Sequence, residues 1–290
     1  LRKEQGYEQV DIPHLAKKDL YEQSGHWEKF QNELFKITTR EGHEFAMKPM
    51  NCPHHIQIYA RKQFSWRDLP QRYASTTKVY RDEQTGELSG LARVRAITQD
   101  DAHVFCRHTQ VKDEILKIWQ IVTEFYKLAG FNLAVRLSLR DPERPKDYLG
   151  SQRVWKDAER KLREIVAEKR VTVKEAIGEA AFYGPKIDFI ARDSLGREWQ
   201  VATIQLDMNL PERFDLVCIN EKGEKERIVM LHAAIMGSIE RYLAILIEHY
   251  AGAFPAWLAP VQVAVLPVSE KFLEYGGFVL KELKTKNIRA

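Results

Sequence analysis

The chain has 290 residues, enough for a full hydrophobic core and for more than one domain. Its 44% hydrophobic and 30% charged residues are typical of a soluble globular protein and argue against a disordered or fibrous one. The net charge of +4 is compatible with a polyanionic partner without requiring one. Three cysteines argue against a disulfide scaffold and favour a reducing compartment, so a cytoplasmic location is expected. No apolar run is long enough to span a membrane.

The first third of the chain combines short helices with pairs of strands. One helix is predicted to end at Gly25, and another carries Pro53 in its first turn. Polar residues between β-rich runs predict a tight turn in one strand pair and a longer loop in the next. The predicted elements are a strand at 7–13, a helix at 14–25, two strands within 29–49, a helix at 52–64 and two strands within 74–105.

Amphipathic helices and a meander of strands follow. Ile115, Trp119, Val122 and Tyr126 recur at helical spacing and predict a helix over 109–128. Strands beside strands, with helices between the blocks, indicate an α+β domain built on an antiparallel sheet. A second, α/β domain is predicted to start beyond residue 260. The remaining predicted elements are a helix at 151–169, strands within 180–233, a buried helix at 237–250, a Pro-rich linker at 254–260, a strand at 261–268 and a helix at 269–286.

An unusual run of polar residues, TQDDAHVF, occupies positions 98–105 of a predicted strand. Alternate side chains of a strand share a face, so Gln99, Asp101 and His103 are predicted to point to one side. Thr98 and Asp100 are predicted to point to the other side. A solvated sheet face would produce the same alternation, so the pattern alone leaves a structural interpretation open.

Charged residues on the neighbouring loop favour a functional interpretation. Arg81, Glu83, Arg93 and Arg95 flank the polar, glycine-containing segment that leads into this strand. Several arginines close to a carboxylate and an imidazole suggest a site for an anionic, polyphosphate-like ligand. No nucleophile-elbow, P-loop or dinucleotide-binding motif occurs in the sequence.

A long-range set of metal-binding side chains is also possible. Cys52, His103 and His232 could hold a zinc ion through three protein ligands and leave one position open. No CxxC or HxxxH spacing supports this set, and many other triples of histidine and cysteine exist in the chain. Cys52 as a small buried hydrophobe and His232 as a hydrogen-bonded core histidine are the alternative interpretations.

Several separated motifs resemble those of one enzyme family. VYRDE (79–83) with LARVRAITQDDAHVFC (91–106) resembles motif 2 of the class II aminoacyl-tRNA synthetases, and MGSIERYLAIL (236–246) resembles motif 3. YEQVDIP (7–13) resembles the end of motif 1. The segments MKPMNCP, QDDAH, AFYGPKIDF, TIQLD and WLAPVQV together are similar to those of the threonyl-tRNA synthetases, and the resemblance covers nearly the whole chain.

The resemblance implies a fold, an activity and partners. The implied fold is the class II catalytic fold, an antiparallel sheet flanked by helices, over residues 1–259. Residues 260–290 would begin a truncated α/β anticodon-binding domain. The implied activity is that of a threonine–tRNA ligase, which uses Zn²⁺, and Mg²⁺ with ATP, to activate L-threonine as an adenylate and transfer it to tRNA(Thr). A homodimer through the motif 1 region is also implied.

The resemblance assigns roles to individual residues. Cys52, His103 and His232 match the zinc ligands of the family. Arg81 matches the arginine that holds the α-phosphate and the substrate carboxylate, and Arg241 matches the one that stacks on adenine. With Lys186, these two arginines are the expected catalytic residues. The other expected ATP-binding residues are Glu83, Arg93 and Gln200, and the expected substrate-binding residues are Met50, Gln99, Asp101, Tyr183, Thr203 and Gln205.

The sequence departs from the family pattern at three positions. An aromatic residue that stacks on adenine is replaced by Ile97, which predicts weaker ATP binding. A glycine next to the zinc ligand is replaced by His54, and Ala233 stands where an arginine is common. Three other hypotheses remain: a class II synthetase for serine or proline, a non-catalytic paralogue that binds tRNA, and a zinc-stabilised structural module. The metal-ligand triple disfavours the first of these, and the motif arginines disfavour the other two.

Overall fold

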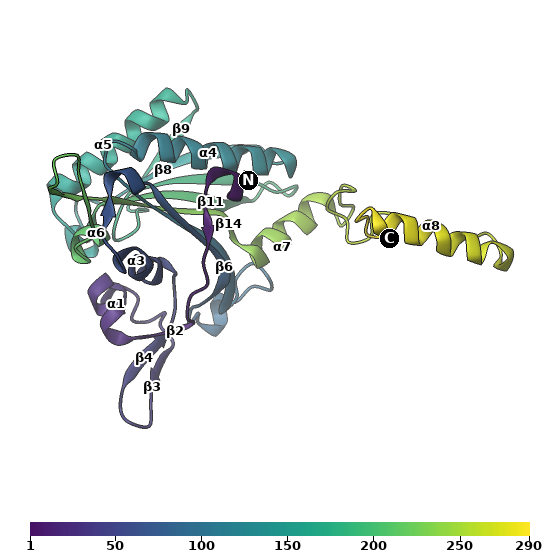
Figure 1. Ribbon diagram of the computed structural model, residues 1–290, viewed down its shortest axis with the longest axis horizontal. Coiled ribbons are helices and arrows are strands. Elements are labelled where there is room, and N and C mark those ends of the chain that lie inside the picture. Colours follow the sequence, from purple (N-terminus) through teal and green to yellow (C-terminus); the bar gives the residue numbers. More distant parts are fainter. The chain divides into compact units, whose positions relative to one another are not determined.

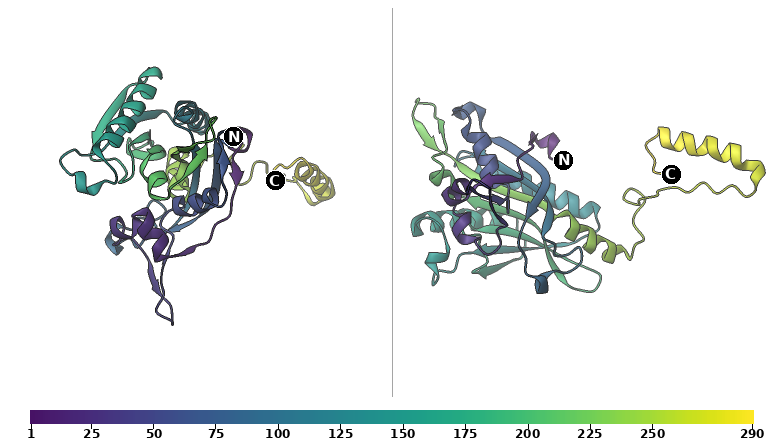
Figure 2. Two further views of the ribbon diagram at one scale, coloured as in Figure 1. Left: turned by 60° about the vertical axis from the view of Figure 1, so that its left-hand side comes forward. Right: turned by 90° about the horizontal axis from the view of Figure 1, so that it is seen from below.

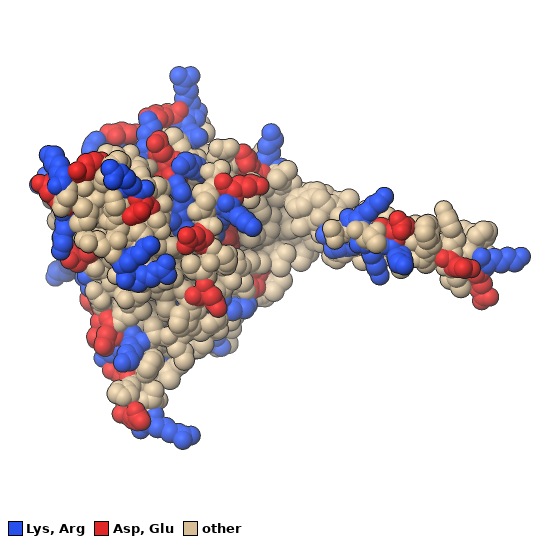
Figure 3. Space-filling model, in the orientation of Figure 1, with Lys and Arg blue, Asp and Glu red and all other residues tan.

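The computed structural model describes residues 1–290, which divide by their internal contacts into Leu1–Ala244 and Ile245–Ala290. The first unit contains all of the strands and is built around one large sheet (Figure 1). On the face shown in Figure 3, acidic and basic side chains are interspersed, as expected for the small net charge. None of the helices combines the length and the apolar character that crossing a membrane requires.

The large sheet has eight strands in the order β1-β6-β7-β14-β11-β10-β8-β9. Its middle pairs, from β6 to β8, are antiparallel, which confirms the predicted antiparallel sheet for the centre of the fold. The bounds in chain order are β1 (Glu8–Gln9), β6 (Gln71–Tyr80), β7 (Ala96–Cys106), β8 (Leu133–Leu139), β9 (Val173–Ile177), β10 (Lys186–Arg192), β11 (Glu198–Asp207) and β14 (Val229–Ser238).

The two edges of the sheet correct this prediction, because each edge pair is parallel. β1 runs parallel to β6, and β9 runs parallel to β8. The sheet is therefore mixed. The sequence analysis did not identify β8 or β9 as strands. β9 is mostly exposed and its apolar residues do not alternate regularly, so the helix before it (α5) and its pairing with β8 place it in the sheet.

Two long helices cover one face of the sheet. They are α4 (Val111–Leu128) and α5 (Gln152–Glu168), both predicted from their helical periodicity. Trp119 of α4 packs edge-on against Phe189 of β10, with ring centroids 5.0 Å apart. The opposite face carries α3 (Cys52–Ala60) beside β7, and Figure 1 shows α3 and α1 on that side. α4 and α5 thus cover one face of the sheet, and α3 lies against the other.

Smaller elements complete the fold. Residues 14–25, predicted as one helix, form a short strand and then a helix that ends at Gly25 with a left-handed φ of 83°. The hairpin of β3 and β4 projects from the sheet (Figure 2). These elements are β2 (Leu15–Lys17), α1 (Lys18–Ser24), α2 (His26–Lys29), β3 (Lys36–Thr38), β4 (Glu44–Met47), β5 (Phe64–Ser65), α6 (Asn209–Arg213), β12 (Val217–Ile219), β13 (Lys225–Arg227) and α7 (Ile239–Tyr250).

The second unit contains one complete long helix, α8 (Leu273–Thr285), as predicted for this region. The strand predicted at 261–268 is not formed, and this part of the sequence analysis was wrong. Leu266 and Val268 are 82% and 89% exposed, so these two apolar side chains are not packed as they would be in a strand of a sheet. The assignment of residues 260–290 to an anticodon-binding domain stays a prediction.

Candidate active site

Strand pairing places the predicted polar residues in cross-strand rows. His103 of β7 lies opposite His232 of β14, which in turn lies opposite Gln205 of β11. In the next row, Ala234 of β14 lies between Asp101 of β7 and Thr203 of β11. All of these side chains line one pocket of about 100 Å³, so the alternation predicted for Gln99, Asp101 and His103 is confirmed. The lining residues are Met50, Cys52, Arg81, Gln99, Asp101, His103, Tyr183, Thr203, Gln205, His232, Ala233 and Ala234.

Asp100, the other carboxylate of the polar run, lies on the opposite face of the sheet. Asp100 pairs with Arg2, whose Nη1 lies 2.6 Å from Oδ1. Its other oxygen accepts long hydrogen bonds of 3.3 Å from the backbone amides of Ile235 and Met236. These amides belong to an irregularity of β14 between Ala234 and Gly237. The two neighbouring aspartates therefore have different functions: Asp101 lines the pocket, and Asp100 stabilises the backbone.

Cys52, His103 and His232 meet at the base of the pocket. One ligand atom from each lies within 4.8 Å of the other two, and all three residues are buried. Cys52 is the first residue of α3, which carries it from the helix layer to the sheet. Burial raises the pKa of the Cys52 thiol, and burial together with His232 lowers the pKa of His103. The raised pKa keeps Cys52 a neutral thiol until a bound metal displaces its proton; one thiolate and two neutral imidazoles then form a donor set that suits zinc, so these residues fit the implied metal.

Other side chains hold the walls of this pocket. Asn51 Nδ2 donates to Asp101 Oδ2 at 3.0 Å, and burial raises the pKa of Asp101. The Tyr183 hydroxyl donates to Gln205 Oε1, and its ring stacks on His232 with centroids 4.6 Å apart. The sequence predicted most of these wall residues through the resemblance. It did not single out Asn51.

His26 is a further residue that the sequence analysis did not identify. Its Nε2 lies 3.2 Å from Met50 Sδ and 3.7 Å from Cys52 Sγ, and the side chain is completely buried. Burial lowers its pKa to about 3, so the ring is neutral at physiological pH. Its position directly after Gly25 carries no spacing signal that links it to the other residues.

A second pocket of about 260 Å³ adjoins the first. The two share Arg81, Gln99, Thr203, Gln205 and Ala234 as a common wall. A small compartment that contains the metal-ligand set thus joins a larger one through an arginine. The residues that line only the larger pocket include Val79, Ile97, Gln200, Gly237, Ser238 and Arg241.

Two arginines border the larger pocket: Arg81 on the shared wall, and Arg241 in the larger pocket alone. The Arg81 guanidinium lies 5.9 Å from the Phe30 ring, and its buried Nε has no hydrogen-bond partner in the protein. Arg241 donates from Nε to the Ala92 carbonyl at 2.8 Å. Burial, then Arg81 and Arg93, lower the pKa of Arg241. Neither Arg81 nor Arg241 forms an ion pair with an acidic side chain, and two such guanidinium groups favour an anion between them.

Three predicted site residues do not line either pocket. Glu83 and Arg93 pair with each other on the loop, with Arg93 Nη2 2.6 Å from Glu83 Oε2. Lys186 Nζ lies 3.4 Å from Asp188 Oδ2 on the same face of β10. These three residues therefore pair with other charged side chains and do not line the two pockets.

Asp188 is a central residue that the sequence analysis overlooked. It is fully buried and accepts hydrogen bonds from Ser138 Oγ at 2.6 Å, Gln200 Nε2 at 2.9 Å and Thr203 Oγ1 at 3.0 Å. Two of these donors line the larger pocket. The only sequence signal was a carboxylate among the apolar residues of KIDFIAR. A carboxylate buried in such a strand needs hydrogen-bond partners, but the sequence does not show which residues they are.

Glu240 connects α7 to the strands that carry the site. Its carboxylate accepts hydrogen bonds from the Thr98 amide and hydroxyl and from Lys78 Nζ. Burial alone raises the pKa of Glu240, but these hydrogen bonds lower it to about 2. Because Arg241 is the next residue, the hydrogen bonds of Glu240 also fix the backbone from which the Arg241 side chain extends.

We expect Glu240→Gln to destabilise the chain by about 1–3 kcal/mol at pH 7, since charged hydrogen bonds are lost. A lowered folded-state pKa gives stability that is present above about pH 4.5 and lost as the pH falls towards 2. The difference in thermal midpoint between wild type and variant should therefore shrink on acidification. Parallel curves from pH 7 to 2.5 would contradict this. Glu164→Gln, an exposed helix pair with Arg160, is the control and should change little.

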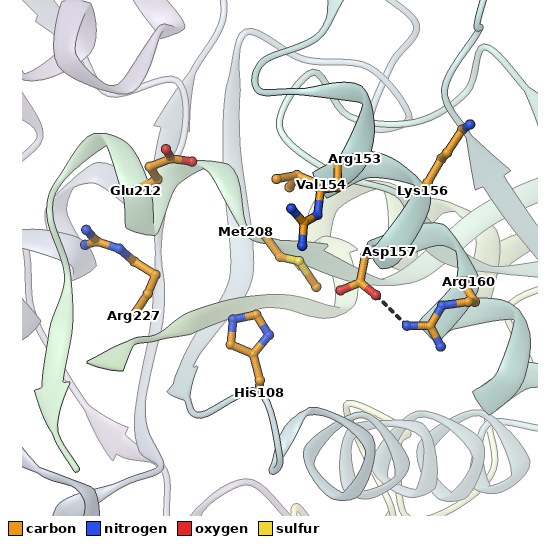
Figure 4. A pocket seen from close by; sticks show the side chains of 9 residues that line it. All are labelled: His108, Arg153, Val154, Lys156, Asp157, Arg160, Met208, Glu212 and Arg227. Atoms are coloured by element: carbon orange, nitrogen blue, oxygen red, sulfur yellow. Dashed lines mark hydrogen bonds and ion pairs between the residues drawn. The ribbon is translucent and has the colours of Figure 1, made fainter. Parts of the chain in front are cut away.

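A larger pocket, about 700 Å³, lies away from these residues (Figure 4). Figure 4 shows Arg153 and His108 directed towards the Met208 side chain, while Asp157 pairs with Arg160. It contains no part of the metal-ligand set and none of the motif arginines, so its size does not make it the candidate active site. Its lining is His108, Arg153, Val154, Lys156, Asp157, Arg160, Met208, Glu212 and Arg227.

Comparison with known proteins identifies the family. Residues 35–250 match the model of the tRNA synthetase class II core domain (G, H, P, S and T). The chain is 50% identical to the threonine–tRNA ligase of Cytophaga hutchinsonii over 98% of its own length and 44% of that protein. It is 51% identical to that of Porphyromonas gingivalis over 100% of its own length and 45% of the relative. The chain thus spans about half the length of the curated relatives it matches.

Solved structures agree with this result. A structure described as the RNA-binding domain of threonyl-tRNA synthetase from Cryptosporidium parvum superposes with a TM-score of 0.94 at 37% identity, over 99% of this chain and 71% of that one. A putative threonyl-tRNA synthetase from Aeropyrum pernix gives a TM-score of 0.84 at 35% identity, over 99% and 67%. The chain therefore belongs to the class II aminoacyl-tRNA synthetases and, within that class, to the threonyl-tRNA synthetase family.

Proposed function

We propose that the chain activates L-threonine with ATP and transfers it to the 3′ end of tRNA(Thr). The observation that carries this proposal is the position of the Cys52, His103 and His232 cluster. It lies in a pocket the size of a small amino acid, and that pocket opens past Arg81 into a larger one. Aminoacylation of tRNA(Thr) with labelled threonine tests the proposal, and incorporation equal to a no-enzyme blank would contradict it.

The same cluster would hold the implied zinc ion. A zinc ion bound there would supply a Lewis acid with an open position for the amino and hydroxyl groups of threonine. Asp101 lies beside the cluster and is held by Asn51, so its carboxylate can accept a hydrogen bond from the substrate. Gln99 and Gln205 complete the polar wall of the pocket.

This polar pocket would select threonine over valine more strongly than over serine. Valine has the shape of threonine but no hydroxyl, so it would leave buried polar groups unpaired, which is discriminated strongly. Serine keeps the hydroxyl and lacks one methyl group, which is worth only about 1–3 kcal/mol. Serine should therefore be activated measurably, and valine should not.

The larger pocket would bind ATP with Mg²⁺. Arg81, at the boundary, would contact both the threonine carboxylate and the α-phosphate, while Arg241 and Ile97 would border the adenine. Gln200 lines the same pocket. Glu83 would read the adenine amino group and Arg93 would contact the γ-phosphate. Their mutual ion pair would have to open for both contacts to form.

The reaction requires positioning more than acid–base chemistry. A threonine carboxylate oxygen would attack the α-phosphorus, and the bond from that phosphorus to the oxygen bridging to the β-phosphate would break, so that pyrophosphate leaves. Mg²⁺ bound to ATP would neutralise charge on the leaving pyrophosphate. Arg81 and Lys186 would stabilise the negative charge that develops on the α-phosphate. A terminal ribose hydroxyl of tRNA then attacks the carbonyl carbon, and AMP leaves.

Ile97→Phe is expected to lower the KM for ATP about two- to tenfold, because a stacked aromatic contact adds roughly 0.5–1.5 kcal/mol. The effect should appear in threonine-dependent ATP–pyrophosphate exchange at saturating threonine. Ile97→Leu adds no aromatic face and is the matched control. An unchanged or raised KM in the phenylalanine variant would contradict the placement of adenine against this residue.

The wider assembly is part of the same proposal. We propose a homodimer through the motif 1 region that includes β1, and residues 260–290 as the beginning of an anticodon-binding domain. The three cysteines are free and buried, the state that the reducing cytoplasm maintains, so we propose a cytoplasmic location. Sedimentation of the chain tests the dimer directly.

A further inference from the structure

We propose that His55 and Asp207 are positioning residues that fix the ring orientation and the tautomer of the two metal-binding histidines. This inference rests on the proposed function, since it concerns the same metal cluster. His103 Nε2 and His232 Nδ1 face each other at 3.1 Å within the cluster. The other nitrogen of each ring points away from the cluster and has a buried partner.

Asp207 holds the ring of His232. Its Oδ2 lies 2.9 Å from His232 Nε2, and Oδ1 accepts the backbone amides of Asn209 and Leu210 at 2.8 and 2.9 Å. The carboxylate is completely buried and fixed at both oxygens. An ionised carboxylate can only accept hydrogen bonds, so Nε2 of His232 carries the proton. Nδ1 then keeps its lone pair directed into the cluster.

His55 acts in the same way on His103. The two Nδ1 atoms lie 2.7 Å apart, and His55 Nε2 lies 3.1 Å from Ser75 Oγ. With His55 protonated at Nε2 and donating to Ser75, its Nδ1 accepts the proton of His103 Nδ1. Nε2 of His103 is then free to bind the metal. If His103 were protonated at Nε2 instead, its N–H would point into the cluster and could not bind a metal.

One short helix supplies both a ligand and its support. Cys52 and His55 are three residues apart in α3 and therefore lie on the same face. His54 lies on another face, where its ring is 6.3 Å from Tyr21 and neither nitrogen has a hydrogen-bond partner in the protein. The doubled histidine in NCPHH thus contains one residue that contacts the cluster ligands and one that does not, which provides a matched control.

The test measures zinc stoichiometry and affinity of the full chain by competition with a chromophoric chelator, independently of activity. Asp207→Asn keeps the size of the side chain and the acceptor for the α6 amides, but its amide group donates towards His232 and forces the wrong tautomer. We expect a 10- to 100-fold weaker zinc affinity, the usual effect of losing such a partner. His55→Phe should weaken zinc binding to a similar degree.

The controls separate positioning from packing. His55→Asn retains an acceptor for His103 and should stay within about threefold of wild type, well below the loss expected for a missing partner. His54→Phe alters the same helix without touching a ligand and should also stay within about threefold of wild type. Thermal unfolding of each variant reports folding. Wild-type affinity in both Asp207→Asn and His55→Phe, with stoichiometric zinc in the wild type, would overturn this inference and leave the proposed function intact.

A measurement on the unmodified chain avoids any folding defect. In the zinc-loaded chain labelled with ¹⁵N-histidine, long-range ¹H–¹⁵N correlations report which ring nitrogens carry protons. Protons at His103 Nδ1 and His232 Nε2 are expected. The opposite assignment for either ring would overturn the inference, and a wild-type chain that binds no zinc would overturn the proposed function as well.

Discussion

Replacing Cys52 with alanine should abolish zinc binding and threonine activation together. Loss of a ligand should exceed the roughly 100-fold loss of affinity expected when a supporting partner is removed. Zinc per chain should therefore fall from one equivalent to almost none. Threonine-dependent ATP–pyrophosphate exchange should fall with it, because Cys52 contributes one of three donors at the base of the threonine pocket. Metal analysis and exchange on the same sample check both effects.

Cys218→Ala is the matched control for this experiment. Cys218 is buried in the same hydrophobic cluster as Cys52, but it does not belong to the metal-ligand set. Its replacement by alanine removes the same atom, a buried sulfur. We expect zinc content and exchange close to wild type, with a modest loss of stability from the cavity. Retention of stoichiometric zinc in Cys52→Ala would contradict the assignment of the ligand.

The second large effect is expected at Arg81, the residue that the two pockets share. Arg81→Ala should lower kcat/KM for adenylate formation about 10²–10³-fold, the usual cost of losing one donor to developing charge. Arg81→Lys keeps the charge but loses the planar fork, so it should recover only part of the rate. Threonine-dependent pyrophosphate exchange measures this loss, and zinc content should remain at the wild-type level.

Arg192 offers a control arginine on the same sheet. Its side chain is 72% exposed and pairs only with the exposed Glu198. Arg192→Ala should leave exchange within about twofold of wild type, since exposed pairs contribute little. Equal rates in Arg81→Ala and Arg192→Ala would show that the guanidinium at the pocket boundary does not contact the reacting groups.

The sequence predicted the centre of the fold better than its edges. Helical periodicity in α4 is a strong local signal, because the helix buries one face against the core. In β7 the strand period of two correctly placed Gln99, Asp101 and His103 on one face, although both faces are buried from Asp100 to Cys106. β9 has no such signal, and it exists because a parallel crossover brings it beside β8. The strand expected at 261–268 lacks a partner in the second unit, and an unpaired strand does not form.

The site was predictable residue by residue only through the family resemblance. Alternation predicted that Asp101 and His103 share a face, but not that Cys52 would reach them from a helix. Side chains that act through others left no pattern in the sequence. Asp188 and Asp207 are identified only by their partners across strands, which no local spacing reveals.

The most direct test of the account is amino-acid-dependent ATP–pyrophosphate exchange with threonine, serine and valine, before zinc removal, after it and after zinc is restored. We predict exchange with threonine, less with serine and none with valine, with loss on zinc removal and recovery on restoration. Equal exchange with threonine and valine, or exchange that survives complete removal of zinc, would contradict a pocket that reads the threonine hydroxyl through Cys52, His103 and His232.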